Sequence, residues 1–476
     1  MGDVIETIRL FRNKPEDIWA IYLAEFFKMI GCIVYDYTVT QKEKLTVDSL
    51  VKKFPDVCDA DILCNIGDQE TETIKGWKKR ISGSDCAELI YVSLDVPAAN
   101  SFLCLRQDGR KVVEEQIIGE IWNRREDELK DICKLFEIYT KYDLFFYYYN
   151  KGNLKFVQEY YPLYGREGRV AKEREAVYQL TFKKFHDAYQ ELLLQKKENR
   201  SFYFQYALVY LKYRLNCVEK LMADTYLFSI EALLDEITEV ERQYPGFVRT
   251  KFLKAGICEM DPVFVWDAEM YYLKAIFAFR ECHGEKSAME DFLHYRLGKY
   301  YEKKRKNNKK AEARYRLSYQ FDPLAFRSQY KIAKISEQKK NYYEANKVAN
   351  DIIDQVLNGY EMSQLMPKQQ IYIYKSFVLL GDLFAQNGIY DTAILGYRRA
   401  LEMSGIVSNF FRQLAGEEEE EEKKIKIQFA NIIKACMPEH PVLTKIISCA
   451  SKIDNRELVE DSFKQLAMGE QRVWNE

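Results

Sequence analysis

The sequence predicts an α/β domain at the N-terminus, followed by an all-α array of paired helices. Over the first 120 residues, short apolar runs rich in β-branched and aromatic residues alternate with helical stretches. In the C-terminal two thirds, small residues recur about twelve positions apart at helical spacing. A chain of 476 residues is also too long for one core, which favours two or three domains.

The N-terminal region is predicted to begin with a strand and an amphipathic helix. Residues 7–11 (TIRLF) have strand character, and the next helix is expected to start at Pro15 and end at Gly31. Further strands are expected at 32–37, 60–68, 87–96 and 101–107, and further helices at 47–55 and 70–82. Apolar strands that alternate with helices are typical of a parallel sheet with both faces covered. Such sheets bind ligands beyond the carboxyl ends of their strands.

This order of elements resembles that of Toll/interleukin-1 receptor (TIR) domains. A first strand runs through the polar loop RNKPED into an amphipathic helix, and a glycine then precedes a strand that contains Asp36. The resemblance covers about residues 5–120 and implies a flavodoxin-like parallel sheet. In TIR domains that cleave NAD, a glutamate on the helix after the third strand is catalytic. The resemblance therefore points to Glu70 and Glu72, at the head of that helix, as catalytic candidates.

The chemistry of NAD cleavage suits a carboxylate at a helix N-terminus. The helix dipole keeps such a group ionised, and its charge can stabilise an oxocarbenium-like transition state. Arg12 and Asp36 are expected to line the same crevice, where Arg12 could hold a phosphate. The alternative is that the two glutamates only stabilise a first helical turn and that Arg12 and Asp36 are surface or capping residues. No GxGxxG or GxxxxGK[ST] motif occurs, so classical nucleotide cradles are absent and no permanently bound cofactor is expected. The TIR resemblance implies NAD as the candidate substrate.

The helical region carries a repeated template of small and aromatic residues. Gly381 is followed by Ala393, Tyr397 and Ala400, and Gly388 lies in the turn between the two predicted helices. The same template recurs three times, as Gly256/Ala268/Tyr272/Ala275, Gly298/Ala311/Tyr315/Ser318 and Ala333/Ala345/Ala349/Ile352. Small residues let two helix backbones approach closely, and an aromatic ring fills the space beside them. This pattern resembles tetratricopeptide (TPR) repeats over about residues 200–405, which implies a TPR-type helical solenoid with a concave face.

The predicted organisation has four parts. They are a TIR-like α/β domain at 1–125, a helical linker at 126–170, TPR-like repeats at 171–415 and a C-terminal helical cap at 416–476. The acidic run GEEEEEEKKIK at 416–426 is expected to be a solvated loop or helix start, with an acidic binding tail as the alternative.

Composition restricts the classes of function. The 71 basic and 73 acidic residues nearly cancel, so no broad nucleic-acid footprint is expected, although a local basic face stays open. The 11 cysteines form no CxxC pair, and the four histidines are far apart, so neither a metal site nor a histidine-based triad is expected. No membrane-spanning run or signal core is found, and free thiols suit a cytoplasmic protein.

Three functions fit these observations. In the first, the repeats bind a protein or a second copy of the chain, and this assembly switches an NAD-cleaving TIR-like domain; proteins of that pairing resemble bacterial immune effectors in antiphage defence. In the second, the chain is a non-enzymatic scaffold or adaptor. In the third, it is a regulator whose concave repeat groove senses a peptide.

Overall fold

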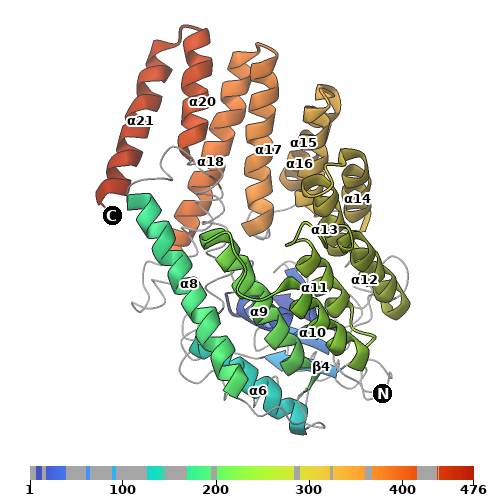
Figure 1. Cartoon of the computed structure of the whole chain (residues 1–476). Coiled ribbons are helices and arrows are strands. Elements are labelled where there is room, and N and C mark those ends of the chain that lie inside the picture. Colours follow the sequence, from blue (N-terminus) through green and yellow to red (C-terminus); the bar gives the residue numbers. More distant parts are fainter. Residues whose placement is uncertain are drawn as a thin grey trace. The chain divides into compact units, whose positions relative to one another are not determined.

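The computed structural model describes residues 7–12, 18–38, 60–64, 88–92, 126–142, 144, 169–194, 201–283, 290–321, 325–359, 367–414, 437 and 439–475 (Figure 1). The chain forms two compact units, Met1–Tyr300 and Tyr301–Glu476. The four-part organisation expected from the sequence stays a prediction.

Four strands in the first unit form one parallel sheet. They are β1 (Thr7–Arg12), β2 (Ile33–Thr38), β3 (Ala60–Cys64) and β4 (Glu88–Val92), and their spatial order is β2-β1-β3-β4. This order equals the first four strands of the flavodoxin-like order. The strands coincide with four of the five predicted ones; the predicted fifth strand and the helices at 47–55 and 70–82 lie outside the described residues. The assignment of this domain to the TIR-like fold stays a prediction.

Helix α1 (Ile18–Met29) joins β1 to β2 and contributes a buried aromatic face. It is followed by Gly31, whose φ of 101° is the left-handed conformation expected of a glycine after a helix. The Phe26 ring packs edge-on against Phe136 of α6 (Glu126–Lys141), with 4.9 Å between ring centroids, and also contacts Tyr139. The described part of the predicted linker therefore shares a core with α1.

The remaining helices of the first unit pack in chain order. They are α8 (Arg169–Leu194), α9 (Phe202–Met222), α10 (Ile230–Gln243), α11 (Val248–Cys258) and α12 (Ala268–His283), followed by α13 (Glu290–Lys303) at the unit boundary. From α8 to α11 each helix contacts the next one, and α9 also contacts α11. Gly256 is buried, and a Cβ placed on it would lie 3.1 Å from the Tyr213 hydroxyl. Ala268, Tyr272 and Ala275 are also buried, as the template predicts.

The second unit repeats this arrangement. Its helices are α14 (Asn308–Phe321), α15 (Phe326–Gln338), α16 (Tyr342–Gly359), α17 (Pro367–Gln386), α18 (Tyr390–Leu414), α20 (Glu439–Lys452) and α21 (Arg456–Asn475). From α14 to α18 each helix contacts the next, and α15 contacts α17. Ala333, Ala345 and Ala349 form one buried cluster with Leu379 and Leu383. Helices α20 and α21 continue the packing from α18.

The α17–α18 hairpin shows why the template needs small residues. A Cβ on Gly381 would lie 2.6 Å from Cδ1 of Tyr397, which is closer than real carbon atoms approach. Gly388 lies in the turn with a φ of 76°. Gly396, which the template does not include, faces the α17 backbone directly, since its Cβ would lie 3.2 Å from the Gly381 amide nitrogen.

Candidate functional site

The carboxyl ends of the four strands meet at one edge of the sheet. Register pairs Arg12 with Thr38 on one side and with Cys64 on the other, and Cys64 with Val92. These four residues form one row, and each is the last residue of its strand. The chain order reverses between β1 and β3, and open α/β sheets bind ligands at such a point.

The residues predicted for the crevice fall at different levels of this edge. Arg12 ends β1, beside β3, and so lies at the point of reversal. Asp36 pairs with Leu10 on the outer strand β2, two residues before the final row. Glu70 and Glu72 lie outside the described residues. The backbone therefore brings Arg12 to the predicted crevice and places Asp36 farther back.

Helix α1, which follows the β1 edge, is fastened to the helical region of the same unit. Arg249 of α11 donates from Nη2 to the carbonyl oxygen of Lys28 at 3.1 Å. Lys28 is in the last turn of α1, where its carbonyl oxygen also accepts a long bond of 3.4 Å from the Gly31 amide and the dipole favours a cation. A Cβ on Gly31 would lie 2.8 Å from Cε1 of Phe202, so this corner also packs tightly on α9.

Arginines and aromatic rings from successive helices surround this anchor. The guanidinium carbons of Arg249 and Arg296 lie 5.5 and 5.6 Å from the centroid of the Phe252 ring. Arg296 also donates to the Tyr272 hydroxyl at 3.3 Å, and Tyr272 bonds Glu259. Burial, with the nearby charge of Glu259, raises the pKa of Tyr272 well above its usual range. This cluster has no signature in the sequence, because its members come from three helices.

The second unit contains two clusters of the same kind, each built on a template tyrosine, and the first of them is formed by Tyr315. The Tyr315 hydroxyl bonds Glu302 at 2.6 Å, and Lys331 of the next hairpin bonds the other oxygen of that carboxylate at 2.9 Å. Burial opposes ionisation of Glu302, but the bond from Tyr315 and the charge of Lys331 lower its pKa overall. These groups join neighbouring hairpins through template tyrosines, which favours a structural role.

The third group belongs to the template that begins at Gly381. Tyr397 bonds Asp382 at 2.8 Å, and Lys445 of α20 bonds both oxygens of that carboxylate. Burial and the adjacent Asp382 raise the pKa of Tyr397. The one template with Ala349 in place of tyrosine has no hydroxyl at that position.

The described histidine side chains do not gather at a site. His294 is buried and bonds Glu290, which in turn accepts two hydrogen bonds from Arg280 at 2.7 and 2.8 Å. His186 stacks on Phe182. Among the residues that the structure describes, no cluster of three or more histidine, cysteine, aspartate or glutamate side chains could hold a metal ion.

An exposed apolar strip lies on α12 and the turn before it. This α12 strip consists of Val263, Trp266, Met270 and Phe277, whose side chains are 75%, 62%, 42% and 61% exposed. Met270 and Phe277 are two helical turns apart and share one face. Apolar groups gathered on one face of a helix are typical of a protein-binding surface.

Comparison with known proteins supplies structures but no family. Neither a family model nor a curated protein matches the chain. Similar solved structures include MamA (15% identity, 37% of this chain and 88% of that chain, TM-score 0.27) and yeast Tom70 (12%, 78% and 81%, TM-score 0.34). Another is YrrB, described as a TPR protein with an unusual peptide-binding site (12%, 46% and 91%, TM-score 0.27). Similarity at this level carries no conclusion about activity or partners.

The described helices of both units pair into successive hairpins. The chain's own contacts support this, because the small residues of the template lie buried where paired helices cross. In the part of the chain that the structure describes, no helix is both long and apolar enough to cross a membrane.

Proposed function

We propose that the chain is a helical-repeat scaffold that binds a protein partner, and the α12 strip is the observation that carries the proposal. Helix α12 is the second helix of its hairpin, and its inner face is filled by the buried Ala268, Tyr272 and Ala275. Its outer face keeps large apolar groups in water at a free-energy cost that a bound partner would remove. The concave groove implied by the TPR resemblance is a separate proposed peptide site.

The surroundings of the α12 strip define the partner. Asp267 and Glu281 are exposed beside it, and Lys274 is the nearby exposed base. An amphipathic helix with apolar residues on one face and basic residues at its margin fits this arrangement. A second copy of the chain would bring the same two acids against their equivalents, which disfavours self-association through this strip.

The binding proposal is tested with the variant Phe277→Glu. Tagged parent and variant chains are used to purify partners from cells, and the captured proteins are quantified by mass spectrometry. We expect a partner held by the parent to be lost with Phe277→Glu and kept with Phe463→Glu, which changes an equally exposed ring on α21. A set of captured proteins identical for all three chains would refute the proposal.

We further propose that the α/β domain makes the chain a TIR-type sensor–effector in bacterial antiphage defence. Partner binding would assemble copies of the chain, and the packed domains would cleave NAD. Support comes from the parallel strand order and from the position of Arg12 at the point of reversal. In this mechanism Arg12 holds a phosphate of NAD, Asp36 lines the crevice, and Glu70 or Glu72 stabilises positive charge on the ribose as the nicotinamide bond breaks.

NAD turnover by the full chain separates this mechanism from a non-enzymatic adaptor. Turnover should rise when a mass measurement shows assembly, and it should fall at least a hundredfold in Glu70→Gln or Glu72→Gln. No turnover by the assembled parent would leave the adaptor function. Unchanged turnover in one glutamine variant would remove that glutamate from the mechanism.

A further inference from the structure

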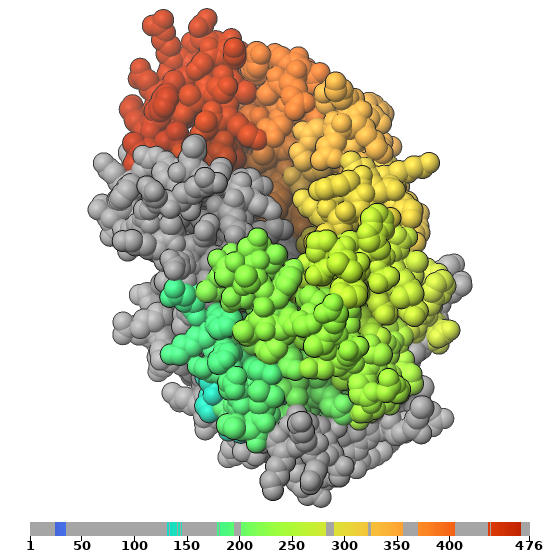
Figure 2. All heavy atoms as spheres, in the orientation of Figure 1, coloured from blue at the N-terminus to red at the C-terminus, as the bar shows by residue number. Residues whose placement is uncertain are grey.

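Two neighbouring turns of the second unit carry a dense group of cations. Residues 303–310 (KKRKNNKK) contain six basic residues and no acid, and the turn after α15 adds Lys339 and Lys340. The lysines of this basic edge are exposed: Lys303, Lys304, Lys306, Lys309, Lys310, Lys339 and Lys340. The segment that holds both turns lies on the face shown in Figure 2, where it is coloured yellow. Charge is thus concentrated locally in a chain whose total charge is near zero.

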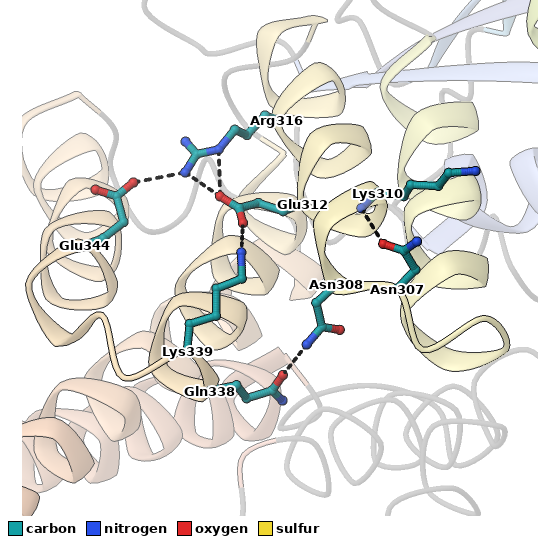
Figure 3. A network of polar contacts seen from close by, with 8 residues as sticks. All are labelled: Asn307, Asn308, Lys310, Glu312, Arg316, Gln338, Lys339 and Glu344. Atoms are coloured by element: carbon teal, nitrogen blue, oxygen red, sulfur yellow. Dashed lines mark hydrogen bonds and ion pairs between the residues drawn. The ribbon is translucent and has the colours of Figure 1, made fainter.

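Polar contacts fix the two turns beside each other (Figure 3). The Asn308 side-chain amide donates to Gln338 at 3.1 Å and joins the first turn to the second. Asn307 accepts from the Lys310 amide, and Asn341 accepts from the Glu344 amide, so an asparagine caps the helix that follows each turn. The lysines therefore project from a rigid edge.

The acids near this edge are already engaged. Glu312 accepts from Arg316 at 2.8 Å and from Lys339 at 2.6 Å, and Arg316 also bonds Glu344 at 3.1 Å (Figure 3). Within the described residues, Lys304, Lys306, Lys309 and Lys340 form no ion pair. Their positive charge is left for an external anion.

Two of these lysines occupy a backbone conformation that suits glycine. Lys306 and Lys340 have φ values of 51° and 60°, whereas the corresponding turn of the α17–α18 hairpin uses Gly388 at 76°. A lysine at such a position is disfavoured by contact between its Cβ and the backbone. Asp224 and Asp454 share this conformation, so it is a property of several described turns, and in two successive turns a lysine occupies it.

We propose that this basic edge binds the phosphate backbone of a nucleic acid. Phosphate contacts need only cations and hydrogen-bond donors on an accessible surface, which the edge provides. Protein interfaces are built around a buried apolar centre, and membrane surfaces retain proteins more firmly when apolar groups insert. Tyr343 lies at the start of α16 and is exposed. Among the described residues of the two loops and the first helical turn after each, it is the one exposed large apolar side chain. Its ring could stack on a base.

The test uses the full chain and a fluorescein-labelled oligothymidylate, with binding followed by fluorescence anisotropy over a range of KCl concentrations. We expect Lys306→Gly/Lys340→Gly to bind at least about tenfold more weakly at low salt. The slope of log K against log salt should become shallower by about 0.7 for each phosphate that the variant no longer neutralises. Because glycine suits both positions, the variant should melt no lower than the parent, so weaker binding would not reflect unfolding.

The matched control is Lys452→Gln/Lys464→Gln, which removes two exposed charges on α20 and α21 of the same unit. It should bind the oligonucleotide as the parent does. Equal losses in both variants, or no binding by the parent at low salt, would overturn the proposal. A further outcome would overturn the proposal. The parent would bind poly-glutamate or phosphatidylserine vesicles but not the oligonucleotide, and this binding would require Lys306 and Lys340.

Discussion

At Lys306 and Lys340 the left-handed φ angle lowers the stability of the fold, while the lysine side chains carry the proposed function. A left-handed conformation costs an L-residue about 1–2 kcal/mol, and the greater freedom of glycine in the unfolded chain offsets about half of that. We predict that Lys306→Gly raises the free energy of unfolding by about 0.5–1 kcal/mol, measured by urea denaturation. Lys347→Gly, inside α16 and also exposed, should lower it by about 1 kcal/mol.

Gly381 gives the opposite prediction, because its environment has no spare volume. Alanine at this position would force the Tyr397 ring or the α18 backbone to move, and we expect a loss of about 1–3 kcal/mol in the free energy of unfolding. Gly246→Ala is the comparison, since a Cβ on Gly246 would have no atom within 4 Å, and its effect should stay within about 0.5 kcal/mol. Equal melting of the two variants would show that the α17–α18 crossing yields easily.

At this scale the sequence predicts buried positions better than polar partners. Ala393 and Gly256 are buried as expected, because helical spacing alone places them on the crossing face. Gly396 was missed, since its closest contact depends on the rotation of α17 against α18. The strain at Lys306 could not be predicted, because lysine gives no signal of a left-handed turn.

Helix α1 illustrates what holds a whole element in position. We predict that Arg249→Ala, which removes the donor to the Lys28 carbonyl, increases amide hydrogen exchange in residues 18–38. A hydrogen bond from a charged donor contributes about 1–3 kcal/mol, so exchange limited by opening of α1 should accelerate about tenfold or more. Arg242→Ala, on the exposed end of α10, should leave exchange in α1 unchanged.

The sequence identifies the elements but not the pairs that lock them. The start of α18 follows from the turn at Gly388, and the places of the four described strands follow from apolar runs rich in β-branched and aromatic residues. Lys331 and Glu302 lie 29 positions apart, and only the stacking of hairpins brings them together. The structure draws attention to one regularity in the sequence: Arg296 and Lys331 each lie two positions before the first small residue of a template, Gly298 and Ala333 respectively. The template that begins at Ala333 lacks the tyrosine, and in the next template Leu379 occupies the position of the base.

For the molecule as a whole, the paired carboxylates predict the response to acid. The pKa values of Glu302, Glu312 and Glu241 are lowered: burial opposes this, but hydrogen bonds from Tyr315, Lys339 and Lys254, respectively, outweigh it. A carboxyl group with a lowered folded-state pKa stabilises the fold above its unfolded value of 4.5, and this contribution disappears as the pH falls through the folded value.

We therefore predict that the free energy of unfolding falls as the pH decreases below about 4.5, and that Glu312→Gln falls less steeply because it binds one proton fewer on unfolding. Urea denaturation at a series of pH values measures both slopes. Parallel slopes for parent and variant would show that Glu312 does not have a lowered pKa.

The net charge of the whole chain does not show where its charges are concentrated. A net charge of −2 argues against a broad nucleic-acid surface, yet it averages over a chain that concentrates six cations in residues 303–310. The concentration of cations is visible in the sequence, but the pairing of Glu312 with Lys339 and Arg316 depends on how the two turns pack.

The contact of Gly31 with Phe202 predicts how truncated fragments of this protein would behave. Two stretches about 170 residues apart meet there without room for one extra carbon atom, and Phe26 is sealed by rings from α6. Neither the strand-bearing portion nor the first hairpins would keep its apolar interior dry if expressed as an isolated fragment. A ligand that displaces α9 would therefore also displace the corner between α1 and β2, because Phe202 and Gly31 cannot move independently.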